Sequence, residues 1–522
     1  MADNKREQER AELHKAIWGI ANDLRGSVDG WDFKNFVLGA LFYRYVSENL
    51  TAFINKIQRE TGEVDFDYTK LSDAEAEVAR DHVVKTKGFF ILPSELFCNV
   101  LKNASLENLN ERLDAVLRHI EQSAVGAASE DDFKGLFDDF DVNSNKLGGT
   151  VLERNKRLLA LLNGVNQMNL GNADFTDNSN DTFGDAYEYL MAMYASNAGK
   201  SGGEFFTPQE VSELLARIAI VGKNSVGKVY DPACGSGSLL LKFAKILGAE
   251  NVRRGFYGQE INITTYNLCR INMFLHNVGY EKFNIAHGDT LINPAHLDDE
   301  PFDVIVSNPP YSIKWEGENN PLLINDPRYA PAGVLAPASK ADFAFVMHSL
   351  SWLSTTGTAA IVCFPGIMYR GGKEKKIRQY LVDNNYVDCV VQLPSNLFFG
   401  ASIATCILVL KKSKTDNRTL FIDASEEFVK VTNNNKLTSE NIQKILDAYI
   451  KRENIPHFSM LSDNEEIAEQ DYNLSVSNYV EKEDLQEEID INKLNLEIDQ
   501  IVAREEELRL SIDKIIKSLG DL

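Results

Sequence analysis

Apolar residues in the first third of the chain recur at the three- and four-residue spacing of an amphipathic helix. The spacing is clearest in residues 31–46, WDFKNFVLGALFYRYV, and it returns in residues 106–120 and 151–162. A helix with such a stripe packs it against other elements. A polar stretch rich in Asn and Asp follows at residues 164–181. The pattern predicts an N-terminal α-helical domain over residues 1–165, which serves as a packing or partner surface rather than as a catalytic unit.

Between residues 181 and 410 the pattern changes to short apolar runs that alternate with helical stretches. The runs are residues 228–231, 255–260, 284–289, 302–308, 358–364, 387–393 and 405–410. Such alternation is typical of a mostly parallel sheet with helices on both faces, so it predicts an α/β fold with a seven-stranded sheet. Ligands of these sheets bind beyond the carboxyl ends of the strands. Four of the runs end in a polar signal, at Asp231, Glu260, Asp289 and Asn308.

The chain closes with a heptad pattern. One heptad position holds Ile491, Ile498, Ile512 and Leu519, the position three residues later holds Leu494, Ile501, Leu508 and Ile515, and Glu505 interrupts the stripe. Residues 481–522 carry 6 basic and 13 acidic side chains. The pattern predicts a C-terminal helical or coiled-coil tail over residues 471–522 that contacts a hydrophobic partner. A helix folded back on its own domain is the alternative.

Composition excludes several classes of protein. The chain has 44% apolar and 25% charged residues, which are globular proportions, and its formal net charge is −23. A chain this acidic repels phosphate backbones, so we do not expect it to hold nucleic acid tightly by itself. The first residues are too charged for a secretion signal, and no apolar run is long enough for a membrane helix. Scattered cysteines and histidines without ligand spacing predict a reduced, metal-free, cytoplasmic protein.

Two short basic clusters stand out against this acidity, at residues 373–378 and 411–414. Each is typical of a solvated surface, and a contact with DNA phosphate is the alternative for the first. No basic region large enough for target recognition follows residue 410. If DNA is a substrate, we therefore expect a partner to bring it.

A glycine-containing turn follows the first predicted strand, in residues 231–237, DPACGSG. Gly235 and Gly237 let a ligand lie against the main chain, although a lone pair of glycines also suits a plain strand-to-helix turn. The third glycine of the dinucleotide fingerprint is missing, which argues against a nicotinamide or flavin. Glu260 ends the next strand, where it can accept both ribose hydroxyls, and Asp289 can accept from an adenine amine. Together they predict a pocket for an adenosine-type cofactor.

The tetrapeptide Asn308-Pro309-Pro310-Tyr311 ends the fourth predicted strand. Two prolines can simply terminate a strand. Chemically, the tetrapeptide fits a methyl acceptor that is a planar amine, a poor nucleophile. If the Asn308 side-chain oxygen and the Pro309 carbonyl accept its two hydrogens, the lone pair shifts toward the methyl donor.

Aromatic residues near this turn can bind the base that carries the amine. Chemistry on a base requires its extraction from the duplex, and an aromatic ring then stacks on it. Tyr311 is the first candidate, and Phe398 or Phe399 can form a second wall.

These signals follow one another in a specific order along the chain. They are residues 204–208 (EFFTP), 231–237, Glu260, Asp289 and 308–311 (NPPY), with further segments at residues 31–48, 183–190, 370–372, 393–400 and 472–480. The order is similar to that of the gamma group of S-adenosylmethionine-dependent amino methyltransferases. More closely, the chain resembles the modification (M) subunit of type I restriction-modification systems, over about residues 15–480.

The resemblance implies a Rossmann-like methyltransferase domain over residues 166–470, with S-adenosyl-L-methionine as cofactor. The implied cofactor site comprises Glu204, Phe205, Phe206, Thr207, Pro208, Gln209, Asp231, Gly235, Ser236, Gly237, Glu260 for the ribose and Asp289 for the adenine. Asn308, Pro309, Pro310 and Tyr311 would handle the target adenine.

The resemblance also implies an adenine-N6 DNA methyltransferase with separate partners. A specificity (S) subunit would recognise the sequence, with two M subunits per S subunit, and a motor-nuclease (R) subunit would complete the restriction enzyme. Methylation of an RNA base or a protein glutamine, and a non-catalytic cofactor-binding scaffold, are the alternatives. Cytosine-N4 methylation more often has Ser or Asp at the place of Asn308.

Overall fold

The computed structural model describes residues 12–20, 30–170, 182–197, 207–398, 402–431, 434–482 and 491–520. The chain divides into two units, Met1–Val480 and Glu481–Leu522. Each is described by itself.

The N-terminal part of the first unit is helical. Its α-helices are α2 (Gly30–Glu60), α3 (Asp73–Glu77), α4 (Arg80–Lys87), α5 (Phe97–Lys102), α6 (Leu109–Ser123), α7 (Glu130–Phe133) and α8 (Val151–Gln167). Helices α2, α6 and α8 confirm the helices predicted over residues 31–46, 106–120 and 151–162. The central helix α2 buries nearly every side chain from Phe33 to Val46, because other helices pack around it.

The rest of this unit is built around a nine-stranded sheet. All seven predicted strands belong to this sheet. The strands are β1 (Val229–Asp231), β2 (Phe256–Glu260), β3 (Phe283–His287), β4 (Phe302–Ser307), β5 (Leu353–Cys363), β6 (Val387–Gln392), β7 (Cys406–Lys411), β8 (Arg418–Asp423) and β11 (Ser459–Asp463). Their order is β11-β8-β6-β7-β5-β4-β1-β2-β3. Neighbours from β3 to β5 are parallel, while β7 runs antiparallel to both β5 and β6. The predicted α/β class and mostly parallel sheet are confirmed.

The sheet is two strands wider than predicted. Strand β8 pairs in parallel with β6, and β11 pairs antiparallel with β8. Both lie in the polar region after residue 410, where the short run TLFI is the main apolar signal. Pairing with β6 buries this run, so the strand depends on its neighbour rather than on a strong local pattern. A separate two-stranded hairpin, β9 (Val429–Val431) and β10 (Asn434–Lys436), follows β8.

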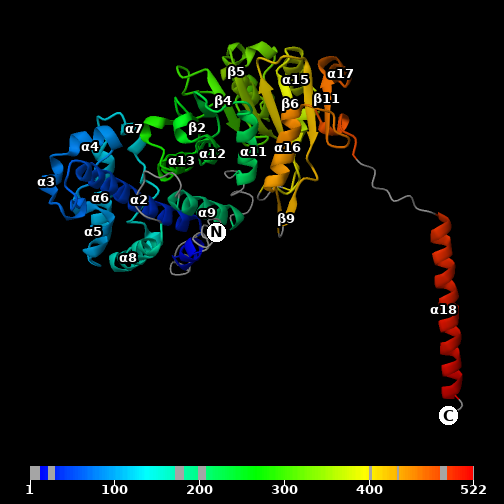
Figure 1. Ribbon diagram of the computed structural model, residues 1–522, viewed down its shortest axis with the longest axis horizontal. Helices are drawn as coiled ribbons and strands as arrows, with labels where there is room; N and C mark the ends of the chain where they lie inside the picture. Colours follow the sequence, from blue (N-terminus) through cyan, green and yellow to red (C-terminus); the bar gives the residue numbers. More distant parts are fainter. Residues whose placement is uncertain are drawn as a thin grey trace. The chain divides into compact units, whose positions relative to one another are not determined.

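Helices cover both faces of the sheet (Figure 1). One face packs against α11 (Gln209–Ala219), α12 (Ser238–Leu247), α13 (Ile263–Leu275) and α16 (Ser439–Lys451), and the other against α14 (Asp342–Trp352) and α15 (Lys373–Asp383). The first of these cores continues into the helical part of the unit, together with α9 (Thr182–Asn197). For example, the Phe274 ring of α13 lies 5.9 Å from Phe42 and 5.0 Å from Phe133, between ring centroids.

Residues near the end of the first unit still belong to its core. After α17 (Asn464–Glu469), Leu474, Val476 and Val480 are buried against the sheet's second face. The described part of the second unit contains the helix α18 (Ile491–Gly520), which confirms the helix predicted from the heptads. No helix within the described ranges is long and apolar enough to cross a membrane.

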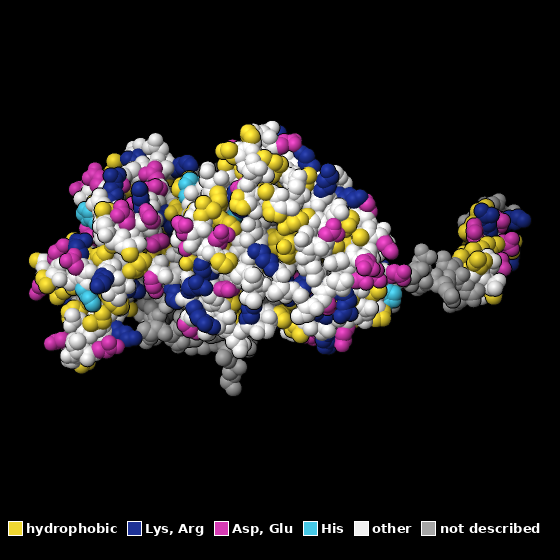
Figure 2. Space-filling model, turned by 90° about the horizontal axis from the view of Figure 1, so that it is seen from above, with side chains coloured by type: hydrophobic (Ala, Val, Ile, Leu, Met, Phe, Trp, Pro, Cys, Tyr) yellow, Lys and Arg dark blue, Asp and Glu magenta, His cyan; other side chains and the backbone are white. Residues whose placement is uncertain are grey.

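Charged side chains of both signs are interspersed on the face shown in Figure 2. Lys and Arg form separate small groups there, with Asp and Glu between them. This distribution agrees with the net charge of −23 and offers a phosphate backbone little continuous attraction on that face.

Candidate active site

The carboxyl ends of β1, β2 and β4 meet at one edge of the sheet and surround a cavity of about 300 Å³. Predicted site residues that line it are Thr207, Asp231, Gly235, Ser236, Glu260, Asp289, Asn308 and Pro310. Parallel strands bring their carboxyl ends to the same edge, which is why residues up to about 100 positions apart in the sequence share one cavity. Gly237, Pro309 and Tyr311 belong to the same turns but are not part of this lining.

The glycine turn after β1 needs its glycines for backbone and packing reasons. Gly235 and Gly237 have φ angles of 53° and 79°, in the left-handed region that favours glycine. A Cβ on Gly237 would lie 2.7 Å from the Cys269 sulfur of α13. Gly237 therefore lets α12 begin close against α13, and Gly235 remains exposed to the cavity.

Glu260 connects the glycine turn to the end of β2 through hydrogen bonds. It is 7% exposed at the end of β2, and its two carboxylate oxygens accept hydrogen bonds from the Gly235 amide at 3.0 Å and the Asn262 amide at 2.9 Å. Burial raises the pKa of Glu260, and these backbone hydrogen bonds oppose the rise. The carboxylate thus joins the glycine turn to β2 before any ligand binds.

Asp231 carries the most perturbed carboxylate of the cavity lining. It is fully buried, and Oδ1 accepts from the Ala233 amide at 3.0 Å and from the Ser307 hydroxyl at 2.9 Å. Oδ2 has no hydrogen-bond partner among the residues that the structure describes. Burial raises the pKa of Asp231 to about 7. An acceptor atom buried beside the cavity is therefore available to a donor from a ligand.

Asp289 follows β3 by two residues, and its Oδ1 accepts from the Leu291 amide at 2.9 Å. Two side chains hold this turn in place. The Thr290 hydroxyl donates to the Pro232 carbonyl at 2.6 Å, and buried Arg328 donates to the Thr290 and Leu291 carbonyls at 2.8 and 2.9 Å. Sequence reasoning missed Arg328, because no local motif marks an arginine whose partners lie 37 and 38 residues away.

Asn308 directly follows β4, and both ends of its side-chain amide are bonded. Its Nδ2 donates to the Thr207 hydroxyl at 3.1 Å, and its Oδ1 accepts from the Tyr311 hydroxyl at 2.6 Å. The Tyr311 ring packs against the main core, where burial raises its pKa well above the ordinary value. Within the tetrapeptide of residues 308–311, the tyrosine is thus turned toward Asn308.

The remaining predicted site residues lie in different surroundings. Phe398 is buried in the core at 4% exposure, whereas Phe399, Glu204, Phe205 and Phe206 lie outside the described residues. Pro208 is buried at the start of α11, and the side-chain amide of Gln209 is buried without a hydrogen-bond partner in the described part of the chain.

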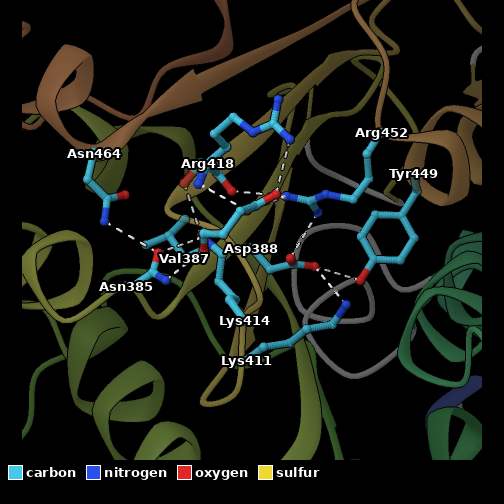
Figure 3. A network of polar contacts seen from close by, with 11 residues as sticks. Asn385, Val387, Asp388, Lys411, Lys414, Arg418, Tyr449, Arg452 and Asn464 are labelled. Atoms are coloured by element: carbon cyan, nitrogen blue, oxygen red, sulfur yellow. Dashed lines mark hydrogen bonds and ion pairs between the residues drawn. The ribbon is translucent and has the colours of Figure 1, made fainter.

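The basic cluster at residues 411–414 is used inside the fold (Figure 3). Lys411, Arg452 and Tyr449 surround the buried Asp388 carboxylate at 3.0, 2.9 and 2.8 Å. Lys414 donates to the Val387 carbonyl at 2.7 Å. This network lies where β6 begins, at the sheet edge opposite the cavity. The interpretation of residues 411–414 as a solvated surface is wrong, because these lysines bond to a buried carboxylate and to main-chain carbonyl groups.

The cluster at residues 373–378 is also largely engaged. Lys373 pairs with Glu318, and Lys375 pairs with Asp471. Arg378 is buried and donates to the carbonyls of Tyr472 and Ile367, each at 2.7 Å. Its hydrogen bond to Tyr472 holds the end of the first unit against α15.

Among the described residues, no group of three or more His, Cys, Asp and Glu side chains is arranged to hold a metal ion.

Comparison with known proteins assigns the family. The model of the N-6 DNA methylase family matches residues 178–488, and that of the HsdM N-terminal domain matches residues 13–165. The chain belongs to the N-6 DNA methylase family. This confirms the resemblance found in the sequence, and S-adenosylmethionine is accordingly the cofactor.

Relatives within this family are similar over most of their length. The type I restriction enzyme MpnII methylase subunit of Mycoplasma pneumoniae is 50% identical, over 99% of this chain and 98% of the relative. The MjaVII methylase subunit of Methanocaldococcus jannaschii is 35% identical, over 70% of this chain and 63% of the relative. The crystal structure of the type I restriction-modification system methyltransferase subunit from Streptococcus thermophilus is 35% identical. It superposes with a TM-score of 0.81, covering 90% of this chain and all of that one.

Proposed function

We propose that this chain is the modification subunit of a type I restriction-modification system and transfers a methyl group from S-adenosylmethionine to N6 of an adenine extruded from DNA. One observation carries the proposal. Asn308, which suits a planar amine, lines the same cavity as Glu260 and Asp289, which suit an adenosine. Membership of the N-6 DNA methylase family favours DNA over RNA or protein glutamine as the substrate.

The residues of the cavity fit the cofactor. The buried and unpartnered Oδ2 of Asp231 suits the ammonium group of its methionine part. Glu260 has carboxylate lone pairs left for ribose hydroxyls after accepting two amides, and Asp289 suits the adenine amine. The cofactor, when bound, supplies a methyl group attached to a positively charged sulfur. Carboxylates are appropriate neighbours for that charge.

Asn308 and Pro309 would act on the target. The Asn308 side-chain oxygen and the Pro309 carbonyl accept the two hydrogens of the adenine amine, which directs the nitrogen lone pair toward the methyl group. Positive charge develops on that nitrogen during transfer, and acceptor dipoles held in place stabilise it without reorganising. Pro310 and the buried Pro309 keep the turn rigid, since each fixes its own backbone φ angle.

Replacing Asn308 tests the proposed function. Asn308→Ala should lower methyl transfer about 10²- to 10³-fold, because an acceptor that acts on the developing charge is lost. Cofactor affinity, measured by calorimetry on the full chain, should stay within a factor of about three, since the side chain serves the other substrate. Asn103→Ala, at an exposed asparagine of the helical region, is the matched control. Full activity of Asn308→Ala would refute the proposal.

We also propose that a separate specificity subunit brings the DNA, with two modification subunits per specificity subunit, and that a motor-nuclease subunit joins this cytoplasmic complex. The net charge of −23 argues against tight DNA binding by the chain alone. Helix α18 exposes a stripe of large apolar residues that includes Leu494, Ile501 and Leu508, and such stripes mark contacts with other proteins.

Truncation after Val480 tests the role of α18. The boundary between the two units lies there, so the first unit should keep its fold and its cofactor affinity. Co-purification with the specificity subunit, and with it sequence-specific methylation, should be lost. Normal co-purification and methylation by the truncated chain would move the partner contact to the N-terminal helical region.

A further inference from the structure

The side-chain amide of Asn308 is held from both sides by hydroxyl groups. Thr207 comes from the segment before α11, 101 residues earlier in the chain, and its Oγ1 accepts from Nδ2 at 3.1 Å. Tyr311 comes from the same turn as Asn308, and its hydroxyl donates to Oδ1 at 2.6 Å. These two contacts use the amide's donor end and its acceptor end.

The orientation of this amide decides whether it can work on an amine. Only the oxygen can accept a hydrogen from the target, and a half-turn of the amide would present a second donor instead. In the orientation seen here, the Thr207 hydroxyl accepts a hydrogen bond from the amide nitrogen, and the amide oxygen is turned away from Thr207. The Thr207 hydroxyl anchors the amide in this orientation by accepting from its nitrogen, and without that bond the amide is free to rotate.

The position of Thr207 in the chain suits it to hold the Asn308 amide in that orientation. It precedes Pro208, which is buried and begins α11, and a residue before proline is confined to extended backbone. Helix α11 buries seven of its eleven residues against the core that it shares with β4 and β5. Thr207 thus directly precedes the N-cap of a helix that is packed against the core.

The Tyr311 hydroxyl occupies the acceptor that the target amine needs. Asn308 Oδ1 accepts from it at 2.6 Å, a short distance for a bond between neutral groups. The Tyr311 ring packs on the main core and does not line the cavity. A target amine that uses the lone pair now bonded to this hydroxyl replaces it as the donor.

We propose that Thr207 is a positioning residue that aims the Asn308 oxygen at the target, and that the Tyr311 hydroxyl is a stand-in donor that the target amine displaces. This inference rests on the proposed function and adds two roles to it. In the absence of target the Tyr311 hydroxyl keeps this oxygen hydrogen-bonded. When the target arrives, one hydrogen bond is exchanged for another.

Thr207→Val and Thr207→Ser test the first role in the assembled methylase with its specificity subunit. Valine removes the hydroxyl at constant shape, and we expect the single-turnover rate at saturating cofactor and DNA to fall about tenfold or more. Serine keeps the hydroxyl and should restore the rate to within about threefold of the parent. The cofactor dissociation constant, measured on the full chain, should change less than about threefold in both variants. Thr86→Val, which removes an exposed hydroxyl on α4, is the control.

Two outcomes would overturn the role of Thr207. One is a parental single-turnover rate for Thr207→Val together with weakened cofactor binding, which would make Thr207 a cofactor ligand only. The other is an equal loss of rate in the valine and serine variants, since serine retains the hydrogen bond.

Tyr311→Phe tests the stand-in hydroxyl by equilibrium binding. Two otherwise identical duplexes are compared, one with adenine at the target position and one with purine, which lacks the 6-amino group. In the parent, an adenine that bonds through the lone pair used by Tyr311 displaces the hydroxyl, and purine does not. Removing the hydroxyl should therefore raise the preference for adenine over purine about two- to tenfold, the worth of one net hydrogen bond. An unchanged or smaller preference would overturn this role.

Asn308→Ala separates failure of this inference from failure of the proposed function. If only the inference fails, Asn308→Ala remains inactive while Thr207→Val methylates like the parent and Tyr311→Phe keeps the parental preference. If the proposed function fails, Asn308→Ala itself methylates normally.

Discussion

On the cofactor side of Asn308, Glu260 and Asp231 are held by hydrogen bonds from backbone amides and a serine hydroxyl around an open cavity. On the target side, Tyr311 is bonded to Asn308 and Phe398 is buried in the core. The difference shows that a site for a small, unchanging ligand can be preformed. On the proposed target side, the aromatic residues are instead engaged with the protein itself.

Phe398→Ala should have the largest effect of the three. We expect it to lower the stability of the fold rather than to remove a stacking contact with the target base. Removing a buried phenylalanine should lower the free energy of unfolding by about 3–5 kcal/mol, because a cavity is left in the core. Denaturant unfolding of the full chain measures this. Tyr369→Ala is the matched control at an aromatic side chain that is 59% exposed, where a change within about 0.5 kcal/mol is expected. Unchanged stability of Phe398→Ala with slow methylation would restore Phe398 as a wall of the target site.

Glu260→Gln should weaken the cofactor side alone. The amide that replaces the carboxylate cannot accept from Gly235, Asn262 and a ribose with the same strength. Cofactor affinity should fall about 10- to 100-fold, as for the loss of a charged acceptor worth about 1.5–3 kcal/mol. Calorimetry on the full chain measures this, with the exposed Glu281→Gln as control. A dissociation constant within twofold of the parent would remove Glu260 from the cofactor site.

Asp231→Asn should have the smallest effect, on the pH dependence of cofactor binding. Burial raises the pKa of Asp231 to about 7, so the carboxyl is mostly protonated below that pH in the free chain. A positively charged ligand favours the ionised form, so binding releases a proton and affinity falls as pH drops below about 7. Below about pH 7, binding should release a measurable fraction of a proton, detected by calorimetry in buffers of different ionisation enthalpy. Asp231→Asn should release none; equal release by parent and variant would place the titrating group elsewhere.

Much of the fold follows from local patterns in the sequence. All seven apolar runs form strands, and each predicted bound lies within five residues of the observed one. Asp231, Glu260 and Asn308 end or directly follow their strands, as predicted. In a parallel sheet, a strand's direction alone places its last residue at the common edge. Sequence reasoning could therefore bring together carboxylates that are far apart along the chain.

Other features depend on contacts that no local pattern records. Strand β8 forms because β6 offers it a partner, and residues 411–414 are held by the buried Asp388 and by main-chain carbonyls. Arg328 reaches its carbonyls only once the turn after β3 lies beside it.

The sequence by itself determined the strands, the carboxylates at their ends and the family of the chain, because these depend on spacing and residue type within short segments. The tertiary structure alone decided that Thr207 meets Asn308 across 101 residues, that Tyr311 turns its hydroxyl to the same amide, and that Phe398 lies in the core. The direction in which a side chain points depends on the packing of all its neighbours, and those neighbours come from every part of the chain.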